Sequence, residues 1–243
     1  MNLSEQTISV LKNFSHINSG LYFQEGQKLK TVAPSKAILA EANINEEIPT
    51  SFGIYDLNRL LGTISLFEKP EIDFGEKQLI LKDSNKRKSC KYSYCDASLV
   101  VRPPEGKEVK LPTEEVTFVL TEDVYNEAVK AAAVLQYPEI AVAGNGKTME
   151  IAILDSKNQM SDEFSHEVWE TTFNFKFVFK VENFSKLMSK EYNVFLSSRG
   201  LSRFDSSDNT LTYYIALEPT STFENWLWLM NLFCGSKNID HKK

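Results

Sequence analysis

The side chains that could do chemistry are few and scattered in this chain of 243 residues. It has three histidines and three cysteines, and only Cys90 and Cys95 lie close together in the sequence. A zinc site needs about four ligands, usually at short paired spacings, and no such set is present. No arrangement of serine, histidine and aspartate indicates a catalytic triad either. The sequence therefore predicts no metal, no cofactor and no enzyme activity.

One short motif is similar to the end of a phosphate-binding loop. Residues 144–148 read Gly-Asn-Gly-Lys-Thr, but Ala141 stands where such a loop has its first glycine. The loop must also lead into a helix, whose N–H groups face the phosphate, whereas residues 149–154 have the composition of a strand. Asn-Gly between two apolar runs is typical of a hairpin turn, and this is the interpretation that we prefer.

Helical spacing of apolar residues recurs in four stretches, at residues 4–17, 56–64, 121–135 and 183–188. Ser4, Asp56 and Asn183 begin three of them and are residue types that favour the N-cap. The expected apolar face of the third helix is Val124, Ala128, Ala131 and Leu135.

The two halves of the chain repeat one order of elements, helix, strands, helix, strands. Residues 56–61 and 183–188 share the pattern cap, apolar, polar, basic, apolar, apolar. This favours a duplicated domain, although amphipathic helices often look alike. Residues 97–115 between the halves are extended and contain three prolines, so we expect a connector there.

The charge excludes a protein that coats nucleic acid through a large basic excess, because 27 basic and 33 acidic residues leave a net charge of −6. Basic residues nevertheless fall on each predicted helix, away from its apolar face. They are Lys12, Arg59, Lys130, Lys186 and Lys190. A shared basic surface of this kind would contact phosphates without reading bases, while solvation of helix faces would explain any one of these residues.

The densest basic cluster is Lys86-Arg87-Lys88 with Lys91, close to Tyr92 and Tyr94. Basic residues interleaved with aromatic ones can bind single-stranded nucleic acid. The preferred interpretation is a charged loop before an edge strand, where lysine discourages the addition of further strands.

Several short stretches carry a family likeness. They are LKNF at 11–14, INSG at 17–20, AEANI at 40–44, IYDLN at 54–58, LG at 61–62, FNF at 173–175 and ALE at 216–218. Together they resemble the sliding clamps of T-even-type bacteriophages, which are DNA polymerase processivity factors. The similarity extends over about residues 1–224.

The resemblance implies an α+β fold, the DNA-clamp fold, with two topologically similar domains that each pack two helices on a curved antiparallel sheet. The domains would be residues 1–96 and 116–224, joined by the connector 97–115 and followed by an extension, 225–243. Three chains would close head-to-tail into a ring, with the helices and the five basic residues facing the hole.

The resemblance also implies a function and its partners. The homotrimer would encircle duplex DNA topologically, without sequence specificity, and tether the phage DNA polymerase. A clamp-loader ATPase complex and a late-transcription activator would be further partners. The protein would act in the cytoplasm of an infected bacterial host, with no membrane partner.

Two further sites follow from the topology of the family. Partner peptides would bind beside the connector, at Val109, Leu111, Pro112, Ile215, Leu217 and Pro219. Neighbouring chains would meet through Cys90, Tyr92 and Tyr94 of one chain and Phe164, His166 and Val168 of the next.

Other interpretations stay open. The family's chains end near the position of Glu224, and residues 229–233 (Leu-Met-Asn-Leu-Phe) resemble clamp-binding peptides. The extension could bind a clamp pocket of its own chain or of a neighbour, or, as we prefer, be an extension without that role. A phage structural protein of duplicated strand-rich domains and a single-strand nucleic-acid binding protein are the alternative functions.

Overall fold

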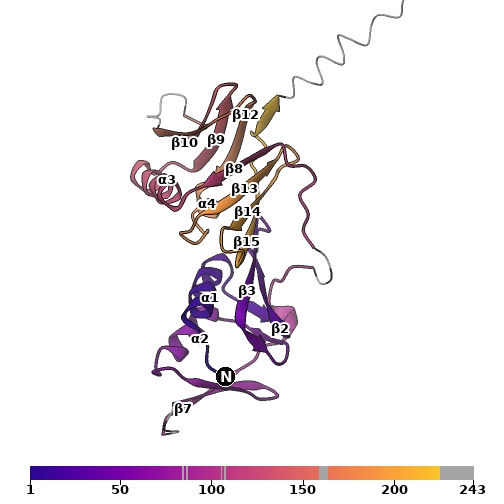
Figure 1. Cartoon of the computed structure of the whole chain (residues 1–243). Coiled ribbons are helices and arrows are strands. Elements are labelled where there is room, and N and C mark those ends of the chain that lie inside the picture. The colour runs from indigo at the N-terminus through magenta and orange to yellow at the C-terminus, as the bar shows by residue number, and fades with distance from the viewer. Residues whose placement is uncertain (84, 86, 105, 107, 159–163, 225–243) are drawn as a thin grey trace, which may run out of the picture. The chain divides into compact units, whose positions relative to one another are not determined.

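The structure is a computed structural model that describes residues 1–83, 85, 87–104, 106, 108–158 and 164–224 (Figure 1). Two compact units make it up. The first comprises Met1–Asn126 and Glu182–Ala216, and the second comprises Glu127–Val181 and Leu217–Lys243. These units do not follow the predicted boundaries at 96, 115 and 224, because strands from before and after the connector pair in one sheet. The extension 225–243 and its two interpretations lie outside the described residues.

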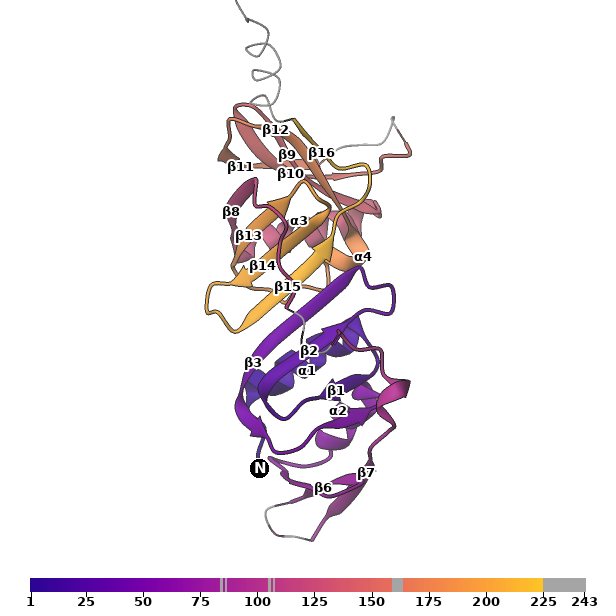
Figure 2. The same cartoon turned by 90° about the vertical axis from the view of Figure 1, so that its right-hand side faces the viewer.

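The first unit contains a six-stranded antiparallel sheet in the order β2-β3-β15-β14-β13-β8. Its strands are β2 (Gly26–Val32), β3 (Ile38–Ile48), β8 (Val116–Leu120), β13 (Tyr192–Ser197), β14 (Leu201–Ser206) and β15 (Leu211–Ala216). β3 pairs with β15 from Ile38 opposite Ile215 to Ala42 opposite Leu211, and Figure 2 shows the two strands side by side. This pairing joins segments that are distant in the sequence.

Two smaller antiparallel sheets complete the strands of the first unit. One pairs β1 (Leu21–Phe23) with β4 (Phe52–Ile54). The other has the order β5-β6-β7, with β5 at Glu71–Phe74, β6 at Gln78–Lys82 and β7 at Ser89–Ser93. In the connector, the helical turn η1 (Ala97–Leu99) is the one regular element among the described residues.

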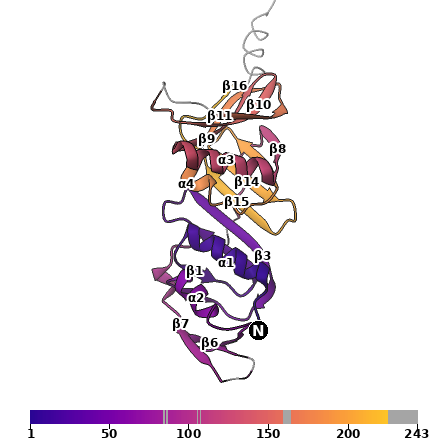
Figure 3. The same cartoon turned by 90° about the vertical axis from the view of Figure 1, so that its left-hand side faces the viewer.

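Two helices, α1 (Glu5–Ile17) and α2 (Leu57–Ile64), cover one face of this unit (Figures 1 and 3). Both predicted N-caps are confirmed. The Ser4 hydroxyl accepts a hydrogen bond from the Thr7 N–H, and the Asp56 carboxylate accepts one from the Arg59 N–H. α1 contacts both β3 and α2, so α1 packs on the sheet and α2 packs on α1.

The predicted fourth helix is much shorter than expected. α4 spans Val181–Phe184, so the prediction that Asn183 caps a helix over 183–188 is wrong, and Asn183 is instead buried inside the element. After α4 the backbone makes i to i+3 hydrogen bonds, from the Lys186 N–H to the Asn183 carbonyl at 3.1 Å and from the Leu187 N–H to the Phe184 carbonyl at 3.2 Å. The Leu187 and Met188 carbonyls accept from the Tyr125 and Tyr192 hydroxyls, each at 2.7 Å. A turn with tertiary hydrogen bonds thus stands where the sequence predicted a continuing helix.

The second unit contains a five-stranded antiparallel sheet in the order β11-β10-β9-β12-β16. Its strands are β9 (Glu139–Asn145), β10 (Thr148–Leu154), β11 (Phe164–Glu170), β12 (Asn174–Lys180) and β16 (Thr222–Glu224). Alternate phenylalanines of β12, at Phe175, Phe177 and Phe179, are buried. They lie on one face of the strand and form part of the core of this unit.

The helix α3 (Glu122–Leu135) has residues in both units. Tyr125, Ala128 and Ala132 are its buried apolar residues, whereas Val124, Ala131 and Leu135 are only half-buried. The predicted face is therefore rotated slightly. Tyr125 accounts for the difference, because its ring packs against Phe184 with 5.6 Å between the ring centres.

The hairpin interpretation of residues 144–148 is confirmed. β9 and β10 pair directly across this turn, and Gly146 adopts a φ of 80°, which favours glycine. A Cβ atom on Gly144 would lie 2.4 Å from the Phe175 ring, so that glycine allows the ring to pack closely. No helix follows the loop, so it lacks the geometry that binds phosphate.

A carboxylate from β3 holds the beginning of α1. The Glu46 side chain accepts hydrogen bonds from the Ser4 N–H and the Thr7 hydroxyl. Burial by itself would raise the pKa of Glu46, but these hydrogen bonds outweigh it and hold the pKa below its ordinary value of 4.5. Ionised Glu46 therefore stabilises the folded state at neutral pH.

We predict that Glu46→Gln lowers the free energy of unfolding at pH 7 by about 1 kcal/mol or less, because the carboxylate remains partly solvated. Since folding depresses this pKa, the contribution is complete above pH 4.5 and is lost as the pH falls through the folded-state pKa. Urea titrations at several pH values measure it. Glu47→Gln is the matched control, because Glu47 is exposed. Equal stability of both variants at pH 7 would exclude this role.

Candidate functional site

Each unit presents an edge strand. Among the described residues, β7 pairs with β6 alone and β11 with β10 alone. Alternate residues of the two strands are half-exposed, and they include five of the six residues predicted for the contact between neighbouring chains. They are Cys90 and Tyr92 on β7, and Phe164, His166 and Val168 on β11. Both edges therefore have backbone groups and apolar side chains with which another strand could pair.

Two interface candidates also support the packing of the first unit. The Tyr92 hydroxyl donates to the Asp56 carbonyl at 2.8 Å, and the Tyr94 ring stacks on Phe52 with 4.5 Å between the ring centres. On β11, His166 Nδ1 lies 2.7 Å from Glu127 Oε2 of α3. The contacts of Tyr92 and Tyr94 orient β7 within the first unit, and the contact of His166 orients β11 within the second.

The five predicted DNA-facing cations differ in their surroundings. Lys12, Arg59 and Lys130 are exposed on α1, α2 and α3. Lys186 and Lys190 are half-exposed and lie after the end of α4, so the prediction that they lie on a helix is wrong. The reason is the early end of α4 at Phe184, after which the chain forms a turn.

One polar contact attaches the segment after α4 to α1. The Asn13 side chain donates to the Lys186 carbonyl at 2.7 Å and accepts from the Tyr213 hydroxyl at 2.8 Å. Lys12 is the neighbour of Asn13 in the chain, so the structure brings Lys12 and Lys186 to one region of the first unit.

Lys190 forms an ion pair and a hydrogen bond within its own chain. Its ammonium group donates to the Asp208 carboxylate and to the Thr210 hydroxyl. Burial alone would raise the pKa of Asp208, but hydrogen bonds from Lys190, Ser206 and Thr210 outweigh it and hold the pKa well below its usual range. The charge of Lys190 is thus largely balanced, and its contribution to a basic surface is smaller than that of Lys12.

An apolar hollow of about 290 Å³ lies beside the connector in the first unit. Strands, a turn and the connector all contribute to it. Its lining residues are Val32, Lys36, Ala37, Leu39, Val101, Arg102, Pro103, Pro104, Val109, Leu201, Tyr214 and Ala216. Of the six residues predicted for a peptide pocket, Val109 alone lines it.

Strand alternation explains why Ile215 does not line the hollow. Ile215 is fully buried and shares its face of β15 with Tyr213, which contacts α1 through Asn13. Tyr214 and Ala216 point to the opposite face and line the hollow. Ile215 therefore does not line this hollow, and the predicted peptide pocket stays a prediction.

The remaining predicted pocket residues lie elsewhere. Leu217 is buried and belongs to the second unit, and Pro219 in the same unit is exposed. Leu111 and Pro112 belong to the connector but do not line the hollow. The part of the connector that does so is its earlier half, at Val101–Pro104, together with Val109.

A buried asparagine fixes the connector beside the hollow. The Asn18 side chain donates to the Val32 carbonyl at 3.1 Å and to the Val101 carbonyl at 2.9 Å, and it accepts from the Gly20 N–H. The alternation of β15 could have identified Tyr214 and Ala216, but no sequence signal predicts the long-range contact of Asn18.

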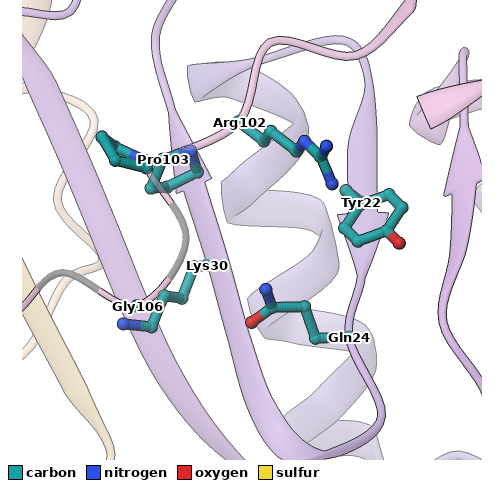
Figure 4. A pocket seen from close by; sticks show the side chains of 7 residues that line it. Tyr22, Gln24, Lys30, Arg102, Pro103 and Gly106 are labelled. Atoms are coloured by element: carbon teal, nitrogen blue, oxygen red, sulfur yellow. The ribbon is translucent and has the colours of Figure 1, made fainter. Parts of the chain in front are cut away.

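A small polar notch adjoins the same part of the connector (Figure 4). Its lining residues are Tyr22, Gln24, Lys30, Arg102, Pro103, Pro104 and Gly106. The Arg102 guanidinium lies over the Tyr22 ring at 4.6 Å from its centre, and the Lys30 ammonium lies 2.8 Å from Glu41. Arg102, Pro103 and Pro104 line both the notch and the apolar hollow.

Other sites considered from the sequence find little support. In the described part of the chain, no group of three or more His, Cys, Asp or Glu side chains could hold a metal ion. No helix in that part is long and apolar enough to cross a membrane. Arg87 and Lys88 are exposed, with their N–H groups donating to Asp83, which agrees with the charged-loop interpretation. Lys86 lies outside the described residues.

Comparison with known proteins decides the family. Residues 4–101 match the family model for DNA polymerase processivity factors. The chain is 31% identical to the sliding clamp of Enterobacteria phage T4 and 30% identical to that of Vibrio phage KVP40. These alignments cover 92% and 90% of this chain, and 100% and 99% of the relatives. The chain belongs to the sliding-clamp family.

Solved structures show the same fold. PCNA of Thermococcus kodakaraensis aligns with a TM-score of 0.67 at 15% identity, covering 90% of this chain and 99% of that one. A. fulgidus PCNA, solved with the C-terminal region of FEN-1, aligns with a TM-score of 0.66 at 15% identity, covering 91% and 100%. The predicted clamp fold is thus confirmed.

Family membership also settles the general role. Sliding clamps are processivity factors and not enzymes, so the expectation that this chain is no enzyme is confirmed. DNA and a DNA polymerase are the partners that this role requires.

We predict that Lys190→Met lowers the free energy of unfolding at neutral pH by about 1 kcal/mol or less, because a half-exposed ion pair with Asp208 is lost. Folding depresses the pKa of Asp208, so the contribution is present at neutral pH and disappears on strong acidification. Lys12→Met, at an exposed position, is the control and should unfold like the parent chain. Thermal unfolding at two pH values measures both. Equal unfolding temperatures for the Lys190 and Lys12 variants would show that the ion pair of Lys190 with Asp208 does not stabilise the folded chain.

Proposed function

We propose that three copies of this chain close head-to-tail around duplex DNA and slide along it while tethering the phage DNA polymerase. The observation that carries this proposal is the pair of edge strands, β7 in one unit and β11 in the other. Pairing β7 of one copy with β11 of the next uses each edge once per chain, as a closed ring requires. Contacts would include Cys90 and Tyr92 on one side and Phe164, His166 and Val168 on the other.

Lys12, Arg59, Lys130 and Lys186 supply the phosphate contacts in this proposal. Such contacts do not read sequence, and weak ones leave the ring free to move. A topological hold needs no large basic excess, so the net charge of −6 is compatible with it. Lys190 contributes less to the phosphate contacts, because it forms an ion pair with Asp208.

The apolar hollow beside the connector is the proposed docking site for partner peptides. The DNA polymerase, a clamp-loader ATPase complex and a late-transcription activator would use it. An archaeal PCNA of the same fold has been solved with the C-terminal region of FEN-1, which supports peptide binding by a clamp. We place this activity in the cytoplasm of an infected bacterial host, as the phage relatives suggest.

We predict that the purified chain has a mass of about 83 kDa in solution, three times its 27.7 kDa, and that Val168→Asp shifts it toward the monomer. A carboxylate on the half-exposed edge of β11 would be buried without a partner in the ring. Val134→Asp is the control, because Val134 is 72% exposed on α3 in the same unit. Sedimentation or light scattering reports the mass. A monomeric parent chain, or equal behaviour of both variants, would refute the ring contact.

We also predict that the combined change of Lys12, Arg59, Lys130 and Lys186 to alanine shortens polymerase products several-fold and keeps the trimer intact. Four phosphate contacts per chain would be removed. The charge-matched control replaces Lys28, Lys147, Lys157 and Lys176, which are exposed on strands and turns. Product length on a primed template measures the effect. Normal processivity of the first variant would remove these residues from the DNA-facing surface.

A further inference from the structure

The open side of β7 carries the backbone groups of its exposed residues. The Tyr94 N–H donates to the Lys77 carbonyl at 3.0 Å. Backbone groups point alternately to the two sides of an antiparallel strand, so the N–H and C=O groups of Ser93 and Lys91 point away from β6. Lys91 is exposed and is the one charged residue of β7. Within the described part of the chain it forms no ion pair.

The open side of β11 presents Ser165 and Glu167 in the same manner. The Gly146 N–H donates to the Phe173 carbonyl at 3.1 Å, which fixes the alternation of backbone groups between β12 and β9. The registered pairs of β9, β10 and β11 carry this alternation across the sheet. It leaves the backbone groups of Ser165 and Glu167 pointing away from β10. Both residues are exposed, whereas His166 between them is half-exposed.

Glu167 has a neighbour of the same charge within its own sheet. It lies directly opposite Glu150 of β10, and like charges at opposite positions destabilise a sheet. The residue on the other side of Glu150 is Ala143, which is uncharged. Neither carboxylate forms an ion pair with another described residue. A cation on a strand added beside β11 would therefore relieve this repulsion.

One antiparallel alignment of β7 with β11 matches the two strands along their length. It sets Lys91 opposite Glu167 and Ser93 opposite Ser165, so that exposed residues meet exposed ones. The half-exposed residues then meet in pairs, which are Cys90 with Val168, Tyr92 with His166, and Tyr94 with Phe164. These are the six residues predicted for the contact between neighbouring chains. The same alignment brings a cation to the two carboxylates of β10 and β11.

We infer that Lys91 of one copy lies opposite Glu167 of the next in this register, and that the pair directs head-to-tail assembly. Pairing of two β7 strands would bring two Lys91 ammonium groups together. Pairing of two β11 strands would add further carboxylates to Glu150 and Glu167. Charge therefore opposes both pairings of like edges and favours β7 with β11. The inference rests on the proposed ring, to which it adds the register and the charges that select it.

Cysteine cross-linking tests the register. Val168→Cys should form an interchain disulfide with native Cys90 on mild oxidation by diamide, because these residues would form a closely spaced, non-hydrogen-bonded pair. His166→Cys and Phe164→Cys should not, since they would meet Cys90 only after a shift of two or four residues. Denaturing gels without reductant measure the cross-link, and adding Cys90→Ser to Val168→Cys should remove it. Cross-linking through His166→Cys or Phe164→Cys in place of Val168→Cys would overturn the register.

Charge reversal tests the pairing of Lys91 with Glu167. Lys91→Glu and Glu167→Lys should each weaken the trimer several-fold, because each sets like charges opposite one another, and the chain with both changes should recover. Lys176→Glu is the matched control, since Lys176 is exposed on β12 between two paired strands. Sedimentation over a dilution series measures the trimer, and thermal unfolding confirms that each variant is folded. Single reversals without effect, or a double variant as weak as the single ones, would refute the pairing.

The outcomes separate this inference from the proposed function. If the parent chain is monomeric, or if Val168→Asp leaves its trimer intact, the ring contact is wrong and the inference fails with it. If Val168→Asp breaks the trimer but neither charge reversal changes its stability, the ring contact stands and the charge pairing alone is refuted.

Discussion

The pairing of β3 with β15 is the constraint on which the rest of the first unit depends. It joins strands from the two ends of the sequence into one six-stranded sheet. One face of that sheet then receives α1, whose Asn13 contacts Tyr213 and the segment after α4. The other face of β15 presents Tyr214 and Ala216 to the connector. Without this register, neither the grouping of Lys12 with Lys186 nor the apolar hollow would form.

Alternation along β15 places two sets of side chains on two faces of the sheet. In the proposed function, the side that carries the helices would contact phosphates, and the side that carries the connector would offer the apolar hollow to a partner. A clamp would then hold DNA by one face and a partner by the other without competition between them. The edge strands β7 and β11 are a third feature, set in orientation by Tyr92 in one unit and His166 in the other.

Local patterns predicted the fold well, whereas long-range contacts decided the site. N-caps at Ser4 and Asp56 and the hairpin at Gly146 depend on neighbouring residues, so the sequence was sufficient for them. The predicted helix at 183–188 is instead a short helix followed by a turn, whose last carbonyls accept from Asn13, Tyr125 and Tyr192, and the local sequence does not indicate these long-range contacts. Alternation along β15 places Ile215 and Tyr214 on opposite faces, whereas no local pattern predicts the contact of Asn18 with Val101.

The central claim is that the protein holds DNA by closure of a ring. Retention of loaded clamp on nicked circular DNA, compared with the same DNA after linearisation, tests it most directly. A closed ring cannot leave a circle without opening but slides off free ends, so we expect long retention on the circle and rapid loss from the linear form. Equal retention on both forms, with steep loss in salt, would contradict the account and indicate ordinary electrostatic binding.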